Sequence, residues 1–131
     1  MTVRELSKLY YLQKLIERDA EHLAELEARL QPGAMNIDGM PKSPTSKNMM
    51  EEIVPLIIEV RERLAQEHAD FLRERNVIER YIQGVEDYQI KLILSYRFVD
   101  LKTWRQIALL IGGNNTEDGV KKACYRFLKN H

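Results

Sequence analysis

Apolar residues recur at seven-residue steps along two long stretches of the chain. The first stretch, residues 3–30, contains no glycine or proline, and a second apolar position follows two members of the repeat. This heptad spacing is typical of a helix that packs against another helix along one seam. Asp19 interrupts the seam. Its apolar members are Leu9, Ile16, Leu23 and Leu30, joined by Leu12 and Leu26.

The second stretch covers residues 48–82 and keeps the same spacing. Pro55 leaves two alternatives open, because the helix could begin just before it or could be kinked there. The segment 31–47 is rich in Pro, Gly and Ser, which predicts a flexible loop. Residues 1–82 are therefore expected to form an antiparallel hairpin, closed within the chain or by a second copy. The second seam comprises Met50, Ile57, Leu64, Phe71 and Ile78, with Ile53 and Val60.

Shorter elements follow from residue 83 onward. Gly84 ends the long pattern, and residues 86–98 predict a third helix with an apolar face formed by Ile90, Ile93, Leu94 and Phe98. Residues 99–102 read as a turn, and Thr103 can cap the helix after it. No stretch alternates like a strand, so the predicted fold class is all-α.

The last two predicted helices are joined by the turn GGNN at residues 112–115. Ile107 and Ile111 lie one turn apart and should face inward, and the small Ala108 suits a close helix crossing. Gly112 or Gly113 can end the first helix in the left-handed conformation, and Asn115 or Thr116 can cap the second. Two short helices joined this way predict a helix-turn-helix, which makes residues 83–131 a C-terminal DNA-binding domain after the hairpin.

The final helix sorts into an apolar and a basic face. Val120, Ala123, Cys124, Phe127 and Leu128 form the apolar stripe. The opposite face favours contact with nucleic acid. Residues 114–119, with Lys122, suit base readout, because Asn can bond adenine through two hydrogen bonds and Gly119 lets the backbone approach DNA closely. The candidate DNA-binding residues are Arg105, Asn114, Asn115, Thr116, Gly119, Lys121, Lys122, Tyr125, Arg126 and Lys129.

Charge is balanced overall but not along the chain. Twenty Lys and Arg match twenty Asp and Glu among the 131 residues, for a formal net charge of zero. From residue 76 onward nine bases face six acids, which leaves the C-terminal part at +3 and the N-terminal part at −3. This asymmetry suits a DNA-binding end and a protein-facing end.

Other chemistry finds little support. His22, His68 and His131 have no metal-ligand spacing, and no nucleophile or glycine loop suggests catalysis or nucleotide binding. We therefore expect no enzyme, catalytic residue, metal or cofactor. Trp104 is interpreted as a core anchor, and Cys124, the single cysteine, as core filler in a reducing cytoplasm. No leader opens the chain and no apolar run approaches about 20 residues, so neither secretion nor membrane insertion is expected.

Residues 81–128 resemble region 4 of the bacterial sigma-seventy family. The similarity lies in ILSYRF at residues 93–98 and WRQIA at residues 104–108. The chain more closely resembles small phage transcriptional regulators of the RinA and ArpU type. That similarity is carried by RFVD at residues 97–100, TWRQIA at residues 103–108 and IGGNNT at residues 111–116. The turn before the last helix is longer than in the usual motif.

This resemblance implies a phage-encoded transcriptional regulator in a bacterial cytoplasm, with double-stranded DNA and host RNA polymerase as partners. The hairpin implies a homodimer or higher oligomer. Two alternatives remain open: a DNA-recognition protein of phage packaging, similar to a small terminase subunit, and a helical adaptor that contacts RNA polymerase without reading DNA. The chain has no room for the sigma domain that melts promoters, so a complete sigma factor is not expected.

Overall fold

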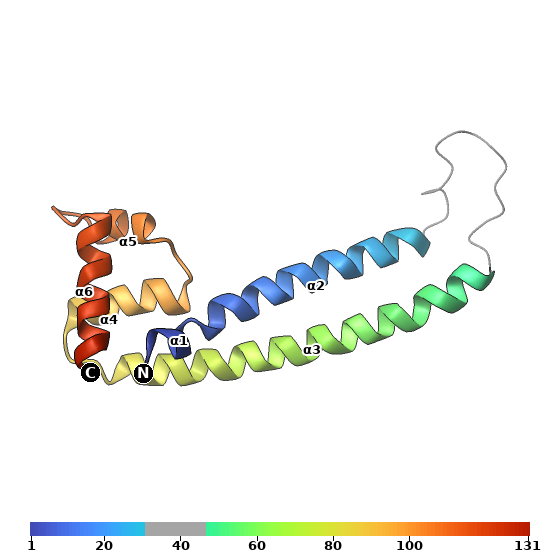
Figure 1. Cartoon of the computed structure of the whole chain (residues 1–131), viewed down its shortest axis with the longest axis horizontal. Helices are drawn as coiled ribbons and strands as arrows, with labels where there is room; N and C mark the ends of the chain where they lie inside the picture. The colour runs from blue at the N-terminus through green and yellow to red at the C-terminus, as the bar shows by residue number, and fades with distance from the viewer. Residues whose placement is uncertain (31–46) are drawn as a thin grey trace. The chain divides into compact units, whose positions relative to one another are not determined.

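The computed structural model describes residues 1–30 and 47–131, in which every regular element is a helix. The prediction of an all-α chain is confirmed (Figure 1). The predicted loop lies outside the described residues except for Lys47, where the second long helix begins. The elements are α1 (Val3–Leu6), α2 (Lys8–Leu30), α3 (Lys47–Gln83), α4 (Tyr88–Leu94), the π-helix η1 (Ser95–Val99), α5 (Trp104–Ile111) and α6 (Glu117–Asn130).

The first predicted helix is divided at Ser7 into α1 and α2. Thr2 caps α1 through a reciprocal pair of hydrogen bonds. The Glu5 amide donates to the Thr2 hydroxyl at 3.2 Å, and the Thr2 amide donates to the Glu5 carboxylate at 3.1 Å. Such a capping box fixes where a helix begins. The heptad pattern alone predicted one uninterrupted helix and was wrong at this position.

The second long helix does not begin at Pro55. It starts at Lys47 and continues through Pro55 to Gln83. Proline has no backbone N–H, so the carbonyl of Glu51, one turn earlier, loses its usual helical donor. The apolar residues on both sides of Pro55 keep the helical spacing, and their burial against α2 compensates for that lost bond.

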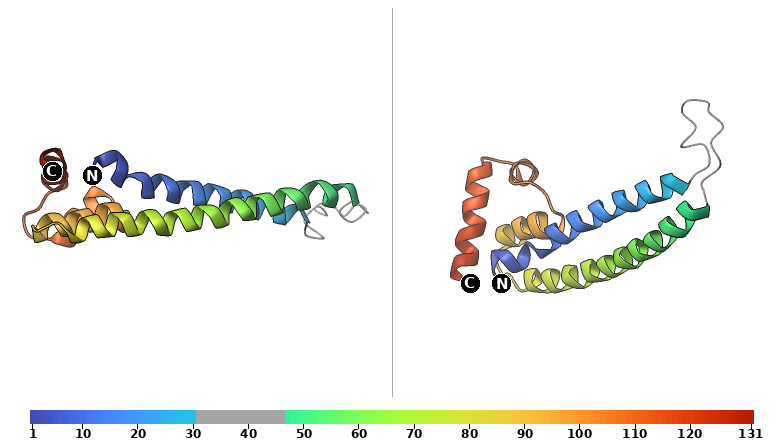
Figure 2. Two further views of the ribbon diagram at one scale, coloured as in Figure 1. Left: turned by 90° about the horizontal axis from the view of Figure 1, so that it is seen from below. Right: turned by 45° about the vertical axis from the view of Figure 1, so that its right-hand side comes forward.

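Helices α2 and α3 run antiparallel, as predicted (Figure 2). Residues 14–69 form one compact unit, and its interior is the predicted heptad seam. Met50 is an exception, because it belongs to the heptad pattern but is exposed. The buried apolar residues of the unit are Ile16 and Leu26 on α2 and Ile53, Ile57, Val60 and Leu64 on α3.

Asp19 lies in this seam as a buried charge. Only 5% of the residue is exposed, and its carboxylate accepts hydrogen bonds from Arg63 Nε at 3.1 Å and Nη2 at 3.3 Å. A buried carboxylate is tolerated when it is paired in this two-pronged way. The residue that interrupts the apolar pattern is therefore a specific link between α2 and α3.

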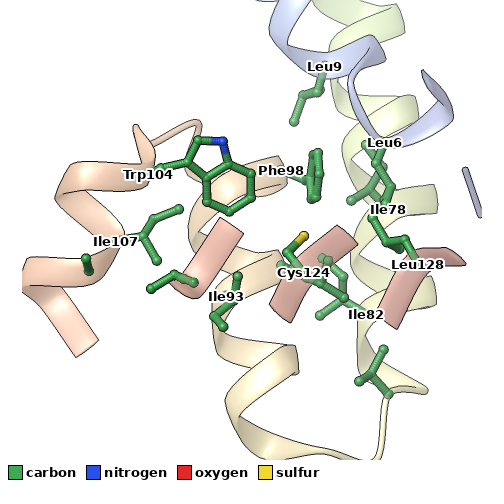
Figure 3. Close-up of a cluster of buried hydrophobic side chains, with 14 residues drawn as sticks. Leu6, Leu9, Ile78, Ile82, Ile93, Phe98, Trp104, Ile107, Cys124 and Leu128 are labelled. Carbon is green, nitrogen blue, oxygen red and sulfur yellow. The ribbon is translucent and has the colours of Figure 1, made fainter. Parts of the chain in front are cut away.

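A second compact unit combines residues 1–13 with residues 70–131. Its core joins the start of the chain and the end of α3 to all of the smaller helices (Figure 3). The predicted domain boundary after residue 82 stays a prediction. The core residues are Leu6, Leu9, Ile78, Ile82, Val85, Ile93, Leu94, Phe98, Trp104, Ile107, Ala108, Val120, Cys124 and Leu128.

Candidate nucleic-acid interface

Helix α5 begins at a capping box and buries one face. The Thr103 hydroxyl accepts from the Gln106 amide at 3.2 Å, and the Gln106 side chain accepts from the Thr103 amide at 2.9 Å. The predicted anchors Trp104, Ile107 and Ala108 are all buried. Because Ala108 has only a methyl group, α6 can pack closely against α5.

The turn between α5 and α6 depends on both glycines. Gly112 and Gly113 have φ angles of +75° and +65°, which glycine adopts without steric cost. The two candidate caps have separate roles. Thr116 caps α6 by accepting from the Gly119 amide at 3.0 Å, whereas the Asn115 amide group donates to the Gly112 carbonyl at 2.9 Å. The turn is thereby closed by side-chain hydrogen bonds at both of its ends.

Helix α6 presents the two faces that the sequence predicted. Val120, Cys124 and Leu128 are buried, while Ala123 and Phe127 are half-buried at the edge of the core. The opposite face is exposed. All ten candidate DNA-binding positions are exposed, with Arg105 on α5, the next three in the turn, and Gly119, Lys121, Lys122, Tyr125, Arg126 and Lys129 on α6.

The charges on this face are only partly neutralised. Lys122 Nζ lies 2.9 Å from a carboxylate oxygen of Asp118, one helical turn earlier. Lys121, Arg126 and Lys129 have no carboxylate partner among the residues that the structure describes. The first turn carries Glu117 and Asp118, which favour the positive end of the helix dipole. Positive charge therefore dominates the middle and end of the exposed face.

An edge-to-face aromatic contact positions Tyr125 on this face. Its ring meets Trp104 edge-on at a centroid distance of 5.7 Å, and the Arg97 guanidinium lies 4.5 Å from the Trp104 ring. Arg97 also donates to the Lys102 carbonyl at 3.0 Å. The sequence predicted Trp104 as an anchor but gave Arg97 no role, because nothing in its local spacing links it to residues of the next two helices.

The structure explains why residue 119 is a glycine. A Cβ atom at this position would lie 2.9 Å from the Thr116 hydroxyl oxygen, closer than non-bonded atoms approach. From the sequence, Gly119 is expected to let DNA approach the backbone. The observed geometry shows that glycine leaves room for the hydroxyl that caps α6.

No known protein family, curated protein or solved structure matches this chain. Within residues 1–30 and 47–131, no helix is both long and apolar enough to cross a bilayer. The same residues contain no group of three His, Cys, Asp or Glu side chains that could hold a metal ion. The geometry of α5, the turn and α6 is accordingly the basis for assigning a function.

Proposed function

We propose that the chain binds double-stranded DNA, with α5 and α6 acting as a helix-turn-helix and α6 entering the major groove. The observation that carries this proposal is the division of α6 into a buried apolar stripe and an exposed face with four bases. A helix held by one side on a small core can present its other side to a groove about 12 Å wide. The four bases are Lys121, Lys122, Arg126 and Lys129.

These bases and the turn have different roles in the proposal. Lys121, Arg126 and Lys129 lack carboxylate partners among the described residues, so they are free to neutralise phosphates. The turn and first helical turn enter the groove first, which gives Asn114 access to base edges. Asparagine reads adenine through one donor and one acceptor at the same time. The phosphate contacts set affinity, and the turn sets the preferred sequence.

The biological role that fits this proposal best is transcriptional regulation. Its support is the resemblance of residues 97–116 to phage regulators of the RinA and ArpU type. Packaging of phage DNA uses the same kind of DNA contact, and the location of the selected site, at a promoter or at a packaging signal, separates the two roles.

A second candidate is a protein adaptor that contacts RNA polymerase without reading DNA. One observation favours it: Leu109 and Leu110 on α5 are exposed, and 75% of Leu109 is open to solvent. Large apolar side chains exposed side by side are common at protein interfaces. A double Leu109→Ser, Leu110→Ser variant should lose polymerase binding if the adaptor role holds, and should keep full duplex affinity if DNA binding is independent of it.

The deciding experiment measures duplex affinity as a function of salt. The parent should bind duplexes from a random pool, and the logarithm of its association constant should fall by about 0.9 per phosphate contact for each tenfold rise in salt. Replacing all four bases of α6 with alanine should abolish this binding. The matched control replaces four other exposed bases, Arg4, Lys8, Arg29 and Arg80, and should retain it. Equal affinity for the two variants would overturn the proposal.

A further inference from the structure

The apolar seam of the hairpin is not available to a second copy of the chain. Leu9, Ile16, Ile57 and Leu64 are buried within the chain, and Leu23 and Phe71 are half-buried. Association of two copies through these residues would require the hairpin to open. Any surface that joins two intact hairpins must therefore lie elsewhere on α2 and α3.

A second apolar stripe runs along α3 beside the seam. Met50, Val54 and Ile58 follow one another at four-residue steps, which places them on one side of the helix. All three are exposed, and half of Ile58 is open to solvent. Ala65 continues the same side further along the helix. A hairpin that only had to satisfy itself would carry polar residues here.

One ion pair identifies the part of α2 that borders this stripe. Arg61, on the same side of α3, lies 2.8 Å from Glu27 of α2. Three exposed alanines also recur at four-residue steps, on the side of α2 adjacent to Glu27: Ala20, Ala24 and Ala28. This side of the hairpin therefore combines large apolar residues on α3 with small ones on α2, and its one central base is already paired within the chain.

The opposite side of the hairpin is charged. Arg63 reaches Asp19 from that side, around an open cavity of about 500 Å³ lined with polar groups. Arg18, His22 and Glu25 contribute to the same lining. Charged side chains are costly to bury without partners, so this side is suited to water. The charged groups of the unit formed by residues 14–69 are thus concentrated on this side, where Leu56 is also exposed.

We propose that a second copy of this chain covers the apolar side, with the two α3 helices antiparallel and related by a two-fold axis near residues 61–62. In this register Ile58 faces Ala65 of the second copy, and Val54 faces Ala69 of the second copy. Val54 and Ile58 each meet an alanine, whereas Met50 lies opposite Arg73 of the second copy, and the two-fold axis repeats every contact reciprocally. The alanines of α2 let the two α2 helices approach each other, which completes a four-helix bundle.

Two features of the stripe favour a second copy over another protein. Between residues 54 and 69 the stripe is self-complementary, because Val54 and Ile58 precede the axis and Ala65 and Ala69 follow it. Arg61 keeps Glu27 as its partner, so covering the stripe near the axis does not leave this base buried alone. Binding to a different protein would not require large and small residues of the same helix to lie opposite each other in an antiparallel pair.

The test compares glutamate substitutions at two exposed residues that lie on different sides of α3. Ile58→Glu changes the apolar stripe, and Leu56→Glu, the matched control, changes an equally accessible residue on the charged side; their exposures are 50% and 45%. Light scattering of the full-length protein at micromolar concentration, without DNA, should give a dimer for the parent and the control and a monomer for Ile58→Glu. A monomeric parent, or a dimer that only the control variant disrupts, would overturn the proposal.

A crosslinking experiment tests the register independently of folding changes. A double Ile58→Cys, Ala65→Cys variant should form covalent dimers on mild oxidation, because the two positions face each other in the bundle. A Leu56→Cys, Ala65→Cys variant should not. The native Cys124 is buried and does not interfere. Equal crosslinking of the two variants would reject the antiparallel register. Because neither experiment contains DNA, the result is separate from that of the DNA-binding proposal.

Discussion

The Thr116 hydroxyl occupies the space into which a methyl group at Gly119 would project, with 2.9 Å between the two positions. The same hydroxyl accepts a hydrogen bond from the Gly119 amide and so begins α6. A helix interior normally favours alanine over glycine by about 1 kcal/mol. At this position the cap and the alanine methyl compete for the same volume.

We therefore predict that the effect of Gly119→Ala depends on residue 116. In the parent background the substitution should displace the cap and stabilise the protein by less than about 1 kcal/mol, or destabilise it. After Thr116→Ala, which should itself cost about 0.5–2 kcal/mol, Gly119→Ala should give the full stabilisation. Urea unfolding of the four proteins in this cycle measures the coupling. Additive changes would show that the two positions do not compete.

Sequence reasoning located this region well because its signals are local. The two glycines, the capping threonines and the spacing of Val120 and Leu128 all act over one or two helical turns, where periodicity and cap preferences are informative. It did not assign Asn115 and Thr116 to their separate roles, because both side chains can cap a helix. Only the path of the turn decides which oxygen reaches the first free amide.

The Asp19–Arg63 pair predicts an acid-sensitive hairpin. Burial acts to raise the pKa of Asp19, but hydrogen bonds with Arg63 and Glu67 outweigh it and hold the pKa below the ordinary value of 3.8. The pair should stabilise the folded state fully above that value, and the contribution should disappear as the pH falls through the lower folded pKa. Thermal melts followed by circular dichroism should show Asp19→Asn less stable than the parent at pH 7.

The difference between these two proteins should shrink as the pH falls below 3.8 and through the lower folded pKa of Asp19, since the aspartate then becomes neutral, as asparagine is. Glu17→Gln is a suitable control, because Glu17 is an exposed acid on the same helix. It should follow the parent at both pH values. A constant gap between parent and Asp19→Asn across the whole range would contradict the assignment of the pH effect to this pair.

The Asp19–Arg63 pair also shows what could not be predicted from the sequence. Asp19 was recognised as an interruption of the heptad, but its partner lies 44 residues away on the other helix. Many acids and bases on α2 and α3 could have met, so spacing cannot choose among them. The π-helix η1 is a similar case. It ends at Val99, and Leu101, two residues later, has a φ of +57° without being glycine. A left-handed leucine has no recognisable sequence signal.

Cys124 should be unreactive in the folded protein. Burial raises the pKa of its thiol to about 11, although the positive charge of Arg97 acts in the opposite direction. At pH 8 the thiolate should then be about 100-fold scarcer than at the ordinary pKa of 9.0. Reaction with a disulfide reagent should be slow in buffer and fast in concentrated urea. A native rate equal to the denatured rate would show that Cys124 is accessible, contrary to its complete burial.

The last prediction separates the two neighbouring asparagines of the turn. The Asn115 side chain is committed to the Gly112 carbonyl at 2.9 Å, whereas Asn114 is exposed and makes no hydrogen bond to other residues of the described chain. Reading adenine requires both the donor and the acceptor of an amide group. Under the proposed DNA binding, Asn114 is therefore the better candidate for base readout, and Asn115 supports the turn.

Asn115→Ala should lower the melting temperature, because the turn loses a hydrogen bond contributing about 0.5–1.5 kcal/mol. Asn114→Ala should melt like the parent. On duplexes, Asn114→Ala should lose preference for one position of the selected site by about 1–3 kcal/mol, while its affinity for random duplexes stays unchanged. Selection from random DNA with each variant, paired with thermal melts, measures both effects. If Asn115→Ala loses the sequence preference without any loss of stability, its bond to Gly112 gives way on DNA and the two roles are reversed.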